Sequence, residues 1–185
     1  MATEDQAIKV LVELTRLQNP FASISPQNGR FLSILVRATK AKSVLEIGTG
    51  NGFSSLFLGY ALKDTGGKLL TIEIDPNRVA IAKENIKRAG LDDVIEITQG
   101  DAHQIVPKLD EEFDFIFLDA DHRNNHKYLD ELLPKLRVGG LLLADDQILL
   151  ARQTIEYTDR VRKDPNLISV LVPIDDGVEM TYKRK

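Results

Sequence analysis

A glycine-rich segment, Val44-Leu-Glu-Ile-Gly-Thr-Gly-Asn-Gly-Phe-Ser-Ser-Leu56, carries the clearest chemical signal in the sequence. It has the pattern of a strand, a tight turn and a helix, and glycine lets a backbone turn sharply and lie against a ligand. The spacing Gly48-x-Gly50-x-Gly52 differs from a dinucleotide fingerprint, whose third glycine comes one residue later, where this chain has Phe53. The segment therefore favours a nucleoside ligand without a pyrophosphate. The alternative is a tight strand-to-helix turn that binds nothing.

Acidic residues at the ends of successive predicted strands extend this candidate site. Glu46 precedes the turn, where a carboxylate suits a cationic amino group such as that of a methionine moiety. Glu73 follows the last glycine by 21 residues, an interval at which a carboxylate can accept from both ribose hydroxyls. Asp101 suits an adenine amino group, and Ala102 offers its backbone amide to the ring, although Gly-Asp is also ordinary turn and N-cap chemistry.

Four further carboxylates follow the next two predicted strands. Asp119 and Asp121 end one strand, and Asp145 and Asp146 end the other. The carboxyl ends of strands in an open α/β sheet form the edge at which ligands bind, so we expect the four side chains to meet there. Because like charges repel, such a group favours a hard divalent cation with oxygen ligands, Mg²⁺ or Ca²⁺.

The elements that must position these residues alternate along the chain. Short β-rich runs are separated by segments with helical spacing, which predicts a doubly wound parallel sheet covered on both faces. Asp75 is expected to cap the helix over 76–89, and the Gly139-Gly140 turn to feed the fifth strand. The predicted strands are 43–47, 68–74, 94–98, 113–118, 141–144, 167–172 and 178–183, the last two forming an antiparallel hairpin, and the predicted helices are 6–17, 29–39, 76–89, 127–136 and 149–163.

Composition limits the remaining function classes. The 185 residues include no cysteine, which excludes disulfides, cysteine-ligated zinc, iron–sulfur clusters and thiolate nucleophiles. A net charge of −4 gives no general attraction to phosphate backbones or anionic membranes. The acidic start of the sequence and the absence of an apolar run of about 20 residues predict a cytoplasmic protein that does not enter the membrane.

In this order, these residues resemble class I S-adenosylmethionine-dependent methyltransferases, and most closely the caffeoyl-CoA and catechol O-methyltransferase-like family. The motifs that carry the resemblance are 24–32, 44–54, 71–76, 115–121, 139–145 and 174–178. The resemblance implies a Rossmann-like α/β fold with a seven-stranded, mostly parallel sheet, and often a homodimer. We expect one methyltransferase domain over 1–185, with N-terminal helices (1–40), a cofactor-binding core (41–146) and a C-terminal helix and hairpin (147–185). The expected cofactor-site residues are Glu46, Gly48, Thr49, Gly50, Ser54, Glu73, Asp101, Ala102, Asp119 and Asp121.

The same resemblance implies metal ligands at Asp119, Asp145 and Asp146, the last of which is normally Asn. The metal would acidify a vicinal hydroxyl whose oxygen attacks the sulfonium methyl. His122 stands where the family usually has a proposed catalytic lysine. Its imidazole suits a base at neutral pH, beside Asp119, but a surface residue fits the sequence equally well.

The favoured function is therefore methyl transfer from S-adenosylmethionine to a hydroxyl of a small-molecule or conjugate acceptor, assisted by a divalent cation. Two alternatives keep the cofactor: a tRNA hydroxyl methyltransferase, and a module that binds the cofactor without catalysis. A dinucleotide oxidoreductase is disfavoured by Phe53. The tRNA alternative would use a basic edge formed by Arg123, Lys127, Arg152, Arg160, Arg162 and Lys163.

Overall fold

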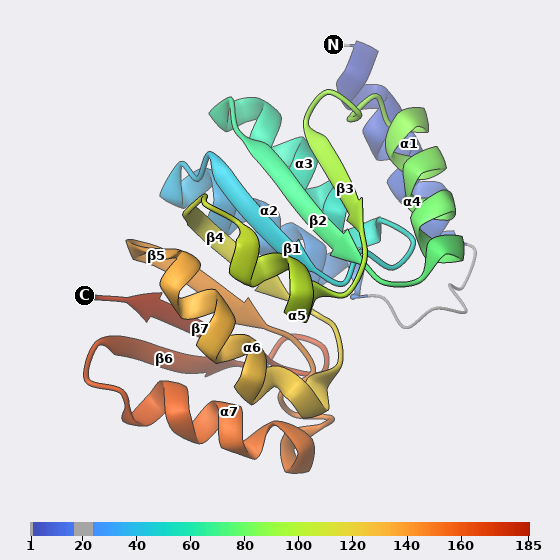
Figure 1. Cartoon of the computed structure of the whole chain (residues 1–185). Helices are drawn as coiled ribbons and strands as arrows, with labels where there is room; N and C mark the ends of the chain where they lie inside the picture. Colours follow the sequence, from blue (N-terminus) through green and yellow to red (C-terminus); the bar gives the residue numbers. More distant parts are fainter. Residues whose placement is uncertain (1, 17–23) are drawn as a thin grey trace.

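A computed structural model describes residues 2–16 and 24–185 of the chain. Its centre is a seven-stranded sheet in the order β3-β2-β1-β4-β5-β7-β6, in which β7 runs antiparallel to both of its neighbours (Figure 1). The predicted mixed sheet and its C-terminal hairpin are thus confirmed. The strands are β1 (Ser43–Ile47), β2 (Lys68–Glu73), β3 (Ile95–Gln99), β4 (Phe113–Leu118), β5 (Leu136–Ala144), β6 (Leu167–Val172) and β7 (Val178–Lys183).

Helices cover the two faces of the sheet in separate groups. Each group packs with its own hydrophobic core. None of the helices in the described ranges has the length and apolarity needed to cross a bilayer. The helices are α1 (Ala2–Arg16), α2 (Pro26–Thr39), α3 (Phe53–Thr65) and α4 (Pro76–Arg88) in the first group, and α5 (Ala102–Ile105), α6 (Asn125–Leu132) and α7 (Ala151–Lys163) in the second, with short 3₁₀ turns η1 (Val106–Lys108), η2 (His122–Asn124) and η3 (Leu133–Lys135).

The central strand β4 shows how the sequence assigns side chains to these two cores. Its side chains alternate between the faces because successive residues of a strand point in opposite directions. Phe115 and Phe117 enter the core under α2 and α3, whereas Ile116 and Leu118 enter the core under α6 and α7. Both faces are buried over residues 115–118, which accounts for the continuous apolar run there.

Side-chain caps fix where the helices beside the strand ends begin. Asp75 accepts a hydrogen bond from the Asn77 amide at 2.8 Å and caps α4, as predicted. Ser25 caps α2, which starts three residues earlier than predicted because Pro26 occupies its first turn. Asp101 caps α5. The N-cap role that the sequence offered as an alternative for Asp101 is therefore present in the structure.

The start of β5 differs from the prediction. The strand begins at Leu136, so the Gly139-Gly140 pair lies inside it and does not form the turn before it. Pairing with β4 shifts register there, from Phe113 opposite Leu136 to Phe115 opposite Leu141, and Gly139 has a φ of 86°. The glycines accommodate a bulge in the ladder. The last residue of the predicted helix 6–17, and the loop from residue 17 to 23, lie outside the described residues.

Glu46 on β1 is a fully buried carboxyl between the sheet and α3. One of its oxygens, Oε2, accepts from the hydroxyl groups of Ser55 and Thr71, the latter at 2.6 Å. The other oxygen has no hydrogen-bond partner among the described residues. Burial outweighs these hydrogen bonds and raises the pKa of Glu46 to about 7.

The raised pKa of Glu46 predicts that the protein loses stability as the pH rises from about 4.5 to about 7. In this interval the folded protein keeps a proton that the unfolded chain has already lost, so the free energy of unfolding falls with increasing pH. The Glu46→Gln variant cannot ionise there. We expect the free energy of unfolding of the variant to rise relative to wild type by on the order of 3 kcal/mol across this interval, as measured by urea unfolding at several pH values. If the free energy of unfolding changed with pH in the same way in both proteins, the raised pKa of Glu46 would be contradicted.

Candidate functional site

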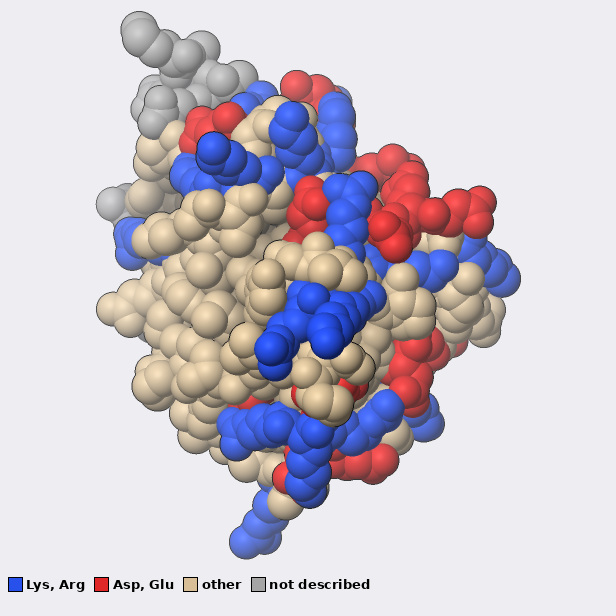
Figure 2. Space-filling model, turned by 90° about the vertical axis from the view of Figure 1, so that its left-hand side faces the viewer, with Lys and Arg blue, Asp and Glu red and all other residues tan. Residues whose placement is uncertain are grey.

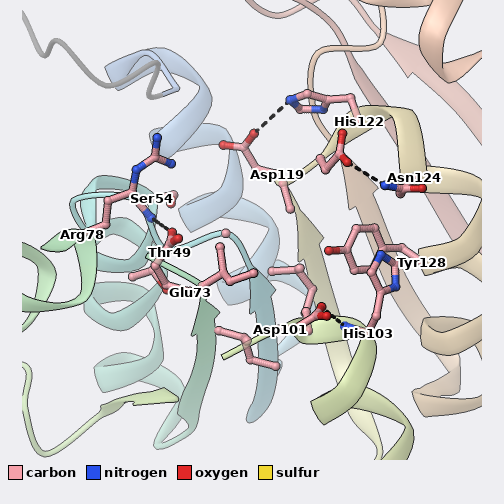
Figure 3. Close-up of a pocket in the computed structure, with 18 of the residues that line it drawn as sticks. Thr49, Ser54, Glu73, Arg78, Asp101, His103, Asp119, His122, Asn124 and Tyr128 are labelled. Carbon is pink, nitrogen blue, oxygen red and sulfur yellow. Dashed lines mark hydrogen bonds and ion pairs between the residues drawn. The ribbon is translucent and has the colours of Figure 1, made fainter. Parts of the chain in front are cut away.

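A cavity of 420 Å³ opens at the carboxyl ends of the parallel strands (Figure 3). Its walls come from the glycine-rich loop after β1, the ends of β2 and β4, the start of α5, and the residues after β5. Of the predicted cofactor residues, all but Glu46 line this cavity, which brings together segments far apart in the sequence. Those that do are Gly48, Thr49, Gly50, Ser54, Glu73, Asp101, Ala102, Asp119 and Asp121.

The glycine-rich loop has a conformation that requires its glycines. Gly48, Gly50 and Gly52 all have positive φ, at 94°, 56° and 88°. At Gly48 a Cβ would also lie 1.9 Å from the backbone oxygen of Asp119. The loop therefore presses directly against the end of β4, with Thr49 and Ser54 facing the cavity.

Glu73 is held at the cavity by its own surroundings. Oε2 accepts from the Gly50 amide at 2.9 Å, and Oε1 accepts from the Asp75 amide at 3.0 Å. Each carboxylate oxygen has a further lone pair, so both can still accept from a ligand hydroxyl. The carboxylate is thus oriented before any ligand binds.

An aromatic wall that the sequence analysis missed lies beside Asp101. The rings of His103 and Tyr128 stack with centroids 4.0 Å apart and an interplanar angle of 14°. His103 Nδ1 lies 2.9 Å from the Glu131 carboxylate, which fixes the ring, and both rings line the cavity. The wall joins α5 to α6, and no local sequence signal links positions 103 and 128.

Glu46, predicted to receive an amino group of the cofactor, does not line the cavity itself. It lies behind Ser54, which does line the cavity, and Ser55. Its contact with a ligand stays a prediction. The oxygen of Glu46 that has no partner is the one feature that still matches the predicted role.

Asp119, His122 and Asp146 form a compact group at one end of the cavity, two of which are labelled in Figure 3. His122 Nε2 lies 3.1 Å from Asp146 Oδ2 and 4.0 Å from Asp119 Oδ1. One ligand atom from each residue falls within 4.8 Å of the others. Two carboxylates and an imidazole are suitable donors for a divalent cation, so the residues present fit a metal.

Asp145, the third predicted ligand besides Asp119 and Asp146, is not among the three donors that lie within 4.8 Å of one another, and that ligand set stays a prediction. Its side chain is buried, and its Oδ1 accepts from Asn28 Nδ2 at 3.1 Å. Asn28 comes from α2, 117 residues away, so no local pattern in the sequence indicates this contact. Where three carboxylates were expected, the structure brings together two carboxylates and His122.

The electrostatics of this group show an excess of negative charge. Burial and the charge of Asp145 raise the pKa of Asp119 well above its usual range. Burial and the charge of Asp146 raise the pKa of Asp145 to about 7. Burial opposes the imidazolium form of His122, but the hydrogen bond to Asp146 and the charge of Asp119 raise its pKa. A bound cation would relieve the repulsion among these carboxylates.

Asp121 lines the cavity but also closes a local turn. Its Oδ1 accepts from the Arg123 amide at 3.3 Å, and its Oδ2 accepts from Asn124 Nδ2 at 2.6 Å. These contacts leave lone pairs on both oxygens, as for Glu73. The position therefore serves the start of η2 and remains available to a ligand.

Three of the six residues of the predicted basic edge are paired with acids. Arg160 pairs with Asp130, Arg162 with the buried Glu179, and Lys163 with Asp159 at 2.6 Å. On the face shown in Figure 2, basic side chains alternate with acidic ones and with a broad uncharged area. The three ion pairs reduce the positive charge that the tRNA alternative requires.

Comparisons with known proteins agree with this geometry. A family model described as O-methyltransferase matches residues 1–184. The catechol O-methyltransferase of Niastella koreensis is 38% identical over 149 residues, covering 78% of this chain and 67% of that protein. The catechol O-methyltransferase of Mycobacterium tuberculosis is 36% identical over 130 residues, covering 70% of this chain and 59% of that protein.

A solved structure shares the whole fold. The O-methyltransferase from Bacillus cereus, in complex with S-adenosylhomocysteine, superposes with a TM-score of 0.81 at 27% identity and covers 100% of this chain and 91% of that one. The match to the family model spans almost the full length of this chain. It includes the sheet, the glycine-rich loop and the acidic residues at the strand ends. The chain belongs to the O-methyltransferase family that includes the catechol O-methyltransferases.

Proposed function

We propose that the protein transfers the methyl group of S-adenosylmethionine to a hydroxyl of a small aromatic acceptor with adjacent hydroxyl groups. One observation carries this proposal: a single cavity holds both the glycine-rich loop with Glu73 and the group of Asp119, His122 and Asp146. A nucleoside cofactor and a charged reaction centre can therefore meet in one cavity. Such positioning is the main requirement of an in-line methyl transfer.

In this proposal the cofactor occupies the cavity along its length. The ribose hydroxyls would donate to Glu73, whose carboxylate is already oriented. The adenine would lie at Asp101 and the Ala102 amide, against the His103 and Tyr128 rings. The methionine part would then extend past the glycine-rich loop. Its sulfonium would point toward Asp119, and its amino group toward Ser54, with Glu46 behind.

The acceptor is assigned to the end of the cavity beside Asp119. When bound, a divalent cation held by Asp119 and Asp146 would acidify an acceptor hydroxyl by charge. The carboxylates would orient the acceptor oxygens, and the hydroxyl proton would pass to the carboxylate of Asp119. Asp145 would contribute its negative charge to the cation site, and Asn28 holds its buried carboxyl next to Asp146.

Catechols are the first acceptors to test, because two relatives above 35% identity are catechol O-methyltransferases. A divalent cation held by Asp119 and Asp146 would also favour an acceptor with two adjacent hydroxyl oxygens. The tRNA alternative has less support, since three of the six residues of its basic edge are paired with acids.

We expect the protein to transfer a labelled methyl from S-adenosylmethionine to catechol in the presence of Mg²⁺, and to stop when EDTA is added. Asp119→Asn should lower kcat by roughly 100-fold, because it removes a charge that positions the acceptor. Asp130→Asn, at an exposed carboxylate paired with Arg160 on α7, is the matched control and should retain wild-type activity.

Full activity in EDTA would contradict a role for the divalent cation in methyl transfer. Cofactor binding without methylation of catechols, hydroxycinnamoyl conjugates or tRNA would instead favour the non-catalytic module.

We further propose that the chain forms a homodimer through the face of β6 and β7 that α7 does not cover. Ile168 and Tyr182 are cross-strand neighbours on this face and are 55% and 41% exposed, and Val170 is 51% exposed. Adjacent exposed apolar side chains on two strands support a protein contact.

Sedimentation velocity should therefore give a dimer for the wild-type protein. Val170→Glu should shift it toward monomer, because the carboxylate would be desolvated in the interface. Ile155→Glu, at an exposed apolar position on α7, is the control and should leave the dimer intact. A wild-type monomer at all concentrations would contradict the proposal.

A further inference from the structure

The residue at position 122 changes the donor chemistry at the reaction centre. His122 begins η2, directly after the acidic end of β4, and its ring turns toward Asp146 after β5. Its Nε2 faces both carboxylates, at 3.1 and 4.0 Å. A lysine ammonium, usual at this position in the resembled family, has no lone pair to give a metal, whereas a neutral imidazole has one.

The distances between the donor atoms suit a shared cation. Metal bonds to imidazole nitrogen and carboxylate oxygen are both about 2 Å long, so two donors on one cation lie about 3 to 4 Å apart. The two separations from His122 Nε2 fall in this range, and all three ligand atoms lie within 4.8 Å of one another. All three donors also line the same cavity, so a cation can reach them from solvent.

The backbone supports the orientation of Asp146. This residue has a φ of 59°, in the left-handed region, where an Asp is tolerated more readily than most residues. The conformation directs Asp146 toward His122 while its neighbour Asp145 turns to Asn28. The two adjacent carboxylates thus face different partners, and the imidazole lies beside Asp119 and Asp146.

We propose that His122 binds the divalent cation through Nε2, together with Asp119 and Asp146, so that the site prefers Mn²⁺, Co²⁺ or Ni²⁺ to Mg²⁺ and Ca²⁺. This inference rests on the cation in the proposed function. Mg²⁺ and Ca²⁺ take oxygen ligands almost exclusively, whereas imidazole nitrogen suits the later divalent metals. With its lone pair on the cation, His122 is a ligand and not a base.

The size of the preference is limited by the other ring nitrogen. With Nε2 on the metal, the proton is on Nδ1, which is buried without a hydrogen-bond acceptor among the described residues. Metal-binding histidines usually have such an acceptor, and its loss typically weakens binding. We therefore expect His122 to contribute roughly tenfold to the affinity for Mn²⁺.

The test uses the small number of histidines in this chain. Only His103, His122 and His126 occur in the sequence. Pulsed electron paramagnetic resonance of the Mn²⁺-loaded protein detects nitrogen bound to the metal, independently of activity. His122→Ala removes the proposed ligand, and His126→Ala is the matched control, because His126 lies on α6 near Glu156 and outside the cavity.

We expect imidazole nitrogen coupling in wild type and in His126→Ala, and its loss in His122→Ala. Mn²⁺ affinity should fall roughly tenfold in His122→Ala, while Mg²⁺ affinity changes less than about threefold. His122→Gln, which offers an amide oxygen, should retain Mg²⁺ binding without nitrogen coupling. Unchanged S-adenosylhomocysteine binding in each variant verifies that the cavity is folded.

Two results would overturn the inference, and they are distinguishable from failure of the proposed function. If Mn²⁺ binds to wild type without nitrogen coupling, or binds equally well to His122→Ala, His122 is not a ligand, and the cation in the proposed function stands. If neither Mn²⁺ nor Mg²⁺ binds to wild type, both the inference and the cation-assisted step fail.

Discussion

The site depends on the contact between Gly48 and the end of β4. The position of a Cβ at Gly48 would be 1.9 Å from the Asp119 carbonyl oxygen, so any other residue would push the two segments apart. The Gly48 amide also donates to Ile72 of β2, and the Asp119 amide donates to Ile47 of β1, each at 2.9 Å. The ends of three parallel strands are thereby fixed against one another. The cofactor loop and the reaction centre consequently share one cavity.

This close contact has an electrostatic consequence. It gathers Glu46, Glu73, Asp119, Asp145 and Asp146 at one sheet edge, most of them with little access to water. The raised pKa values of Glu46, Asp119 and Asp145 reflect the cost of that burial. A sulfonium cofactor and a divalent cation both bring positive charge to this edge. The same acids that oppose folding at neutral pH would thus favour binding of both ligands.

The sequence was sufficient for features that depend on local pattern. Strand ends, the Asp75 cap and the glycine-rich turn each follow from a few adjacent residues. It was insufficient where distant segments meet. The hydrogen bond between Asn28 and Asp145 spans 117 residues, and the stacking of His103 on Tyr128 joins two helices. The bulge in β5 was missed because Gly139-Gly140 has the same sequence pattern as a turn.

Calorimetric titration of S-adenosylhomocysteine into the wild-type protein and into Glu73→Ala, with NAD as a second ligand, tests the cofactor site at this sheet edge. We expect micromolar or tighter binding to wild type, about tenfold or more weaker binding to Glu73→Ala because two ribose hydrogen bonds are lost, and no measurable binding of NAD. Binding of S-adenosylhomocysteine no tighter than millimolar, or equal affinity in the two proteins, would contradict a cofactor site at this sheet edge.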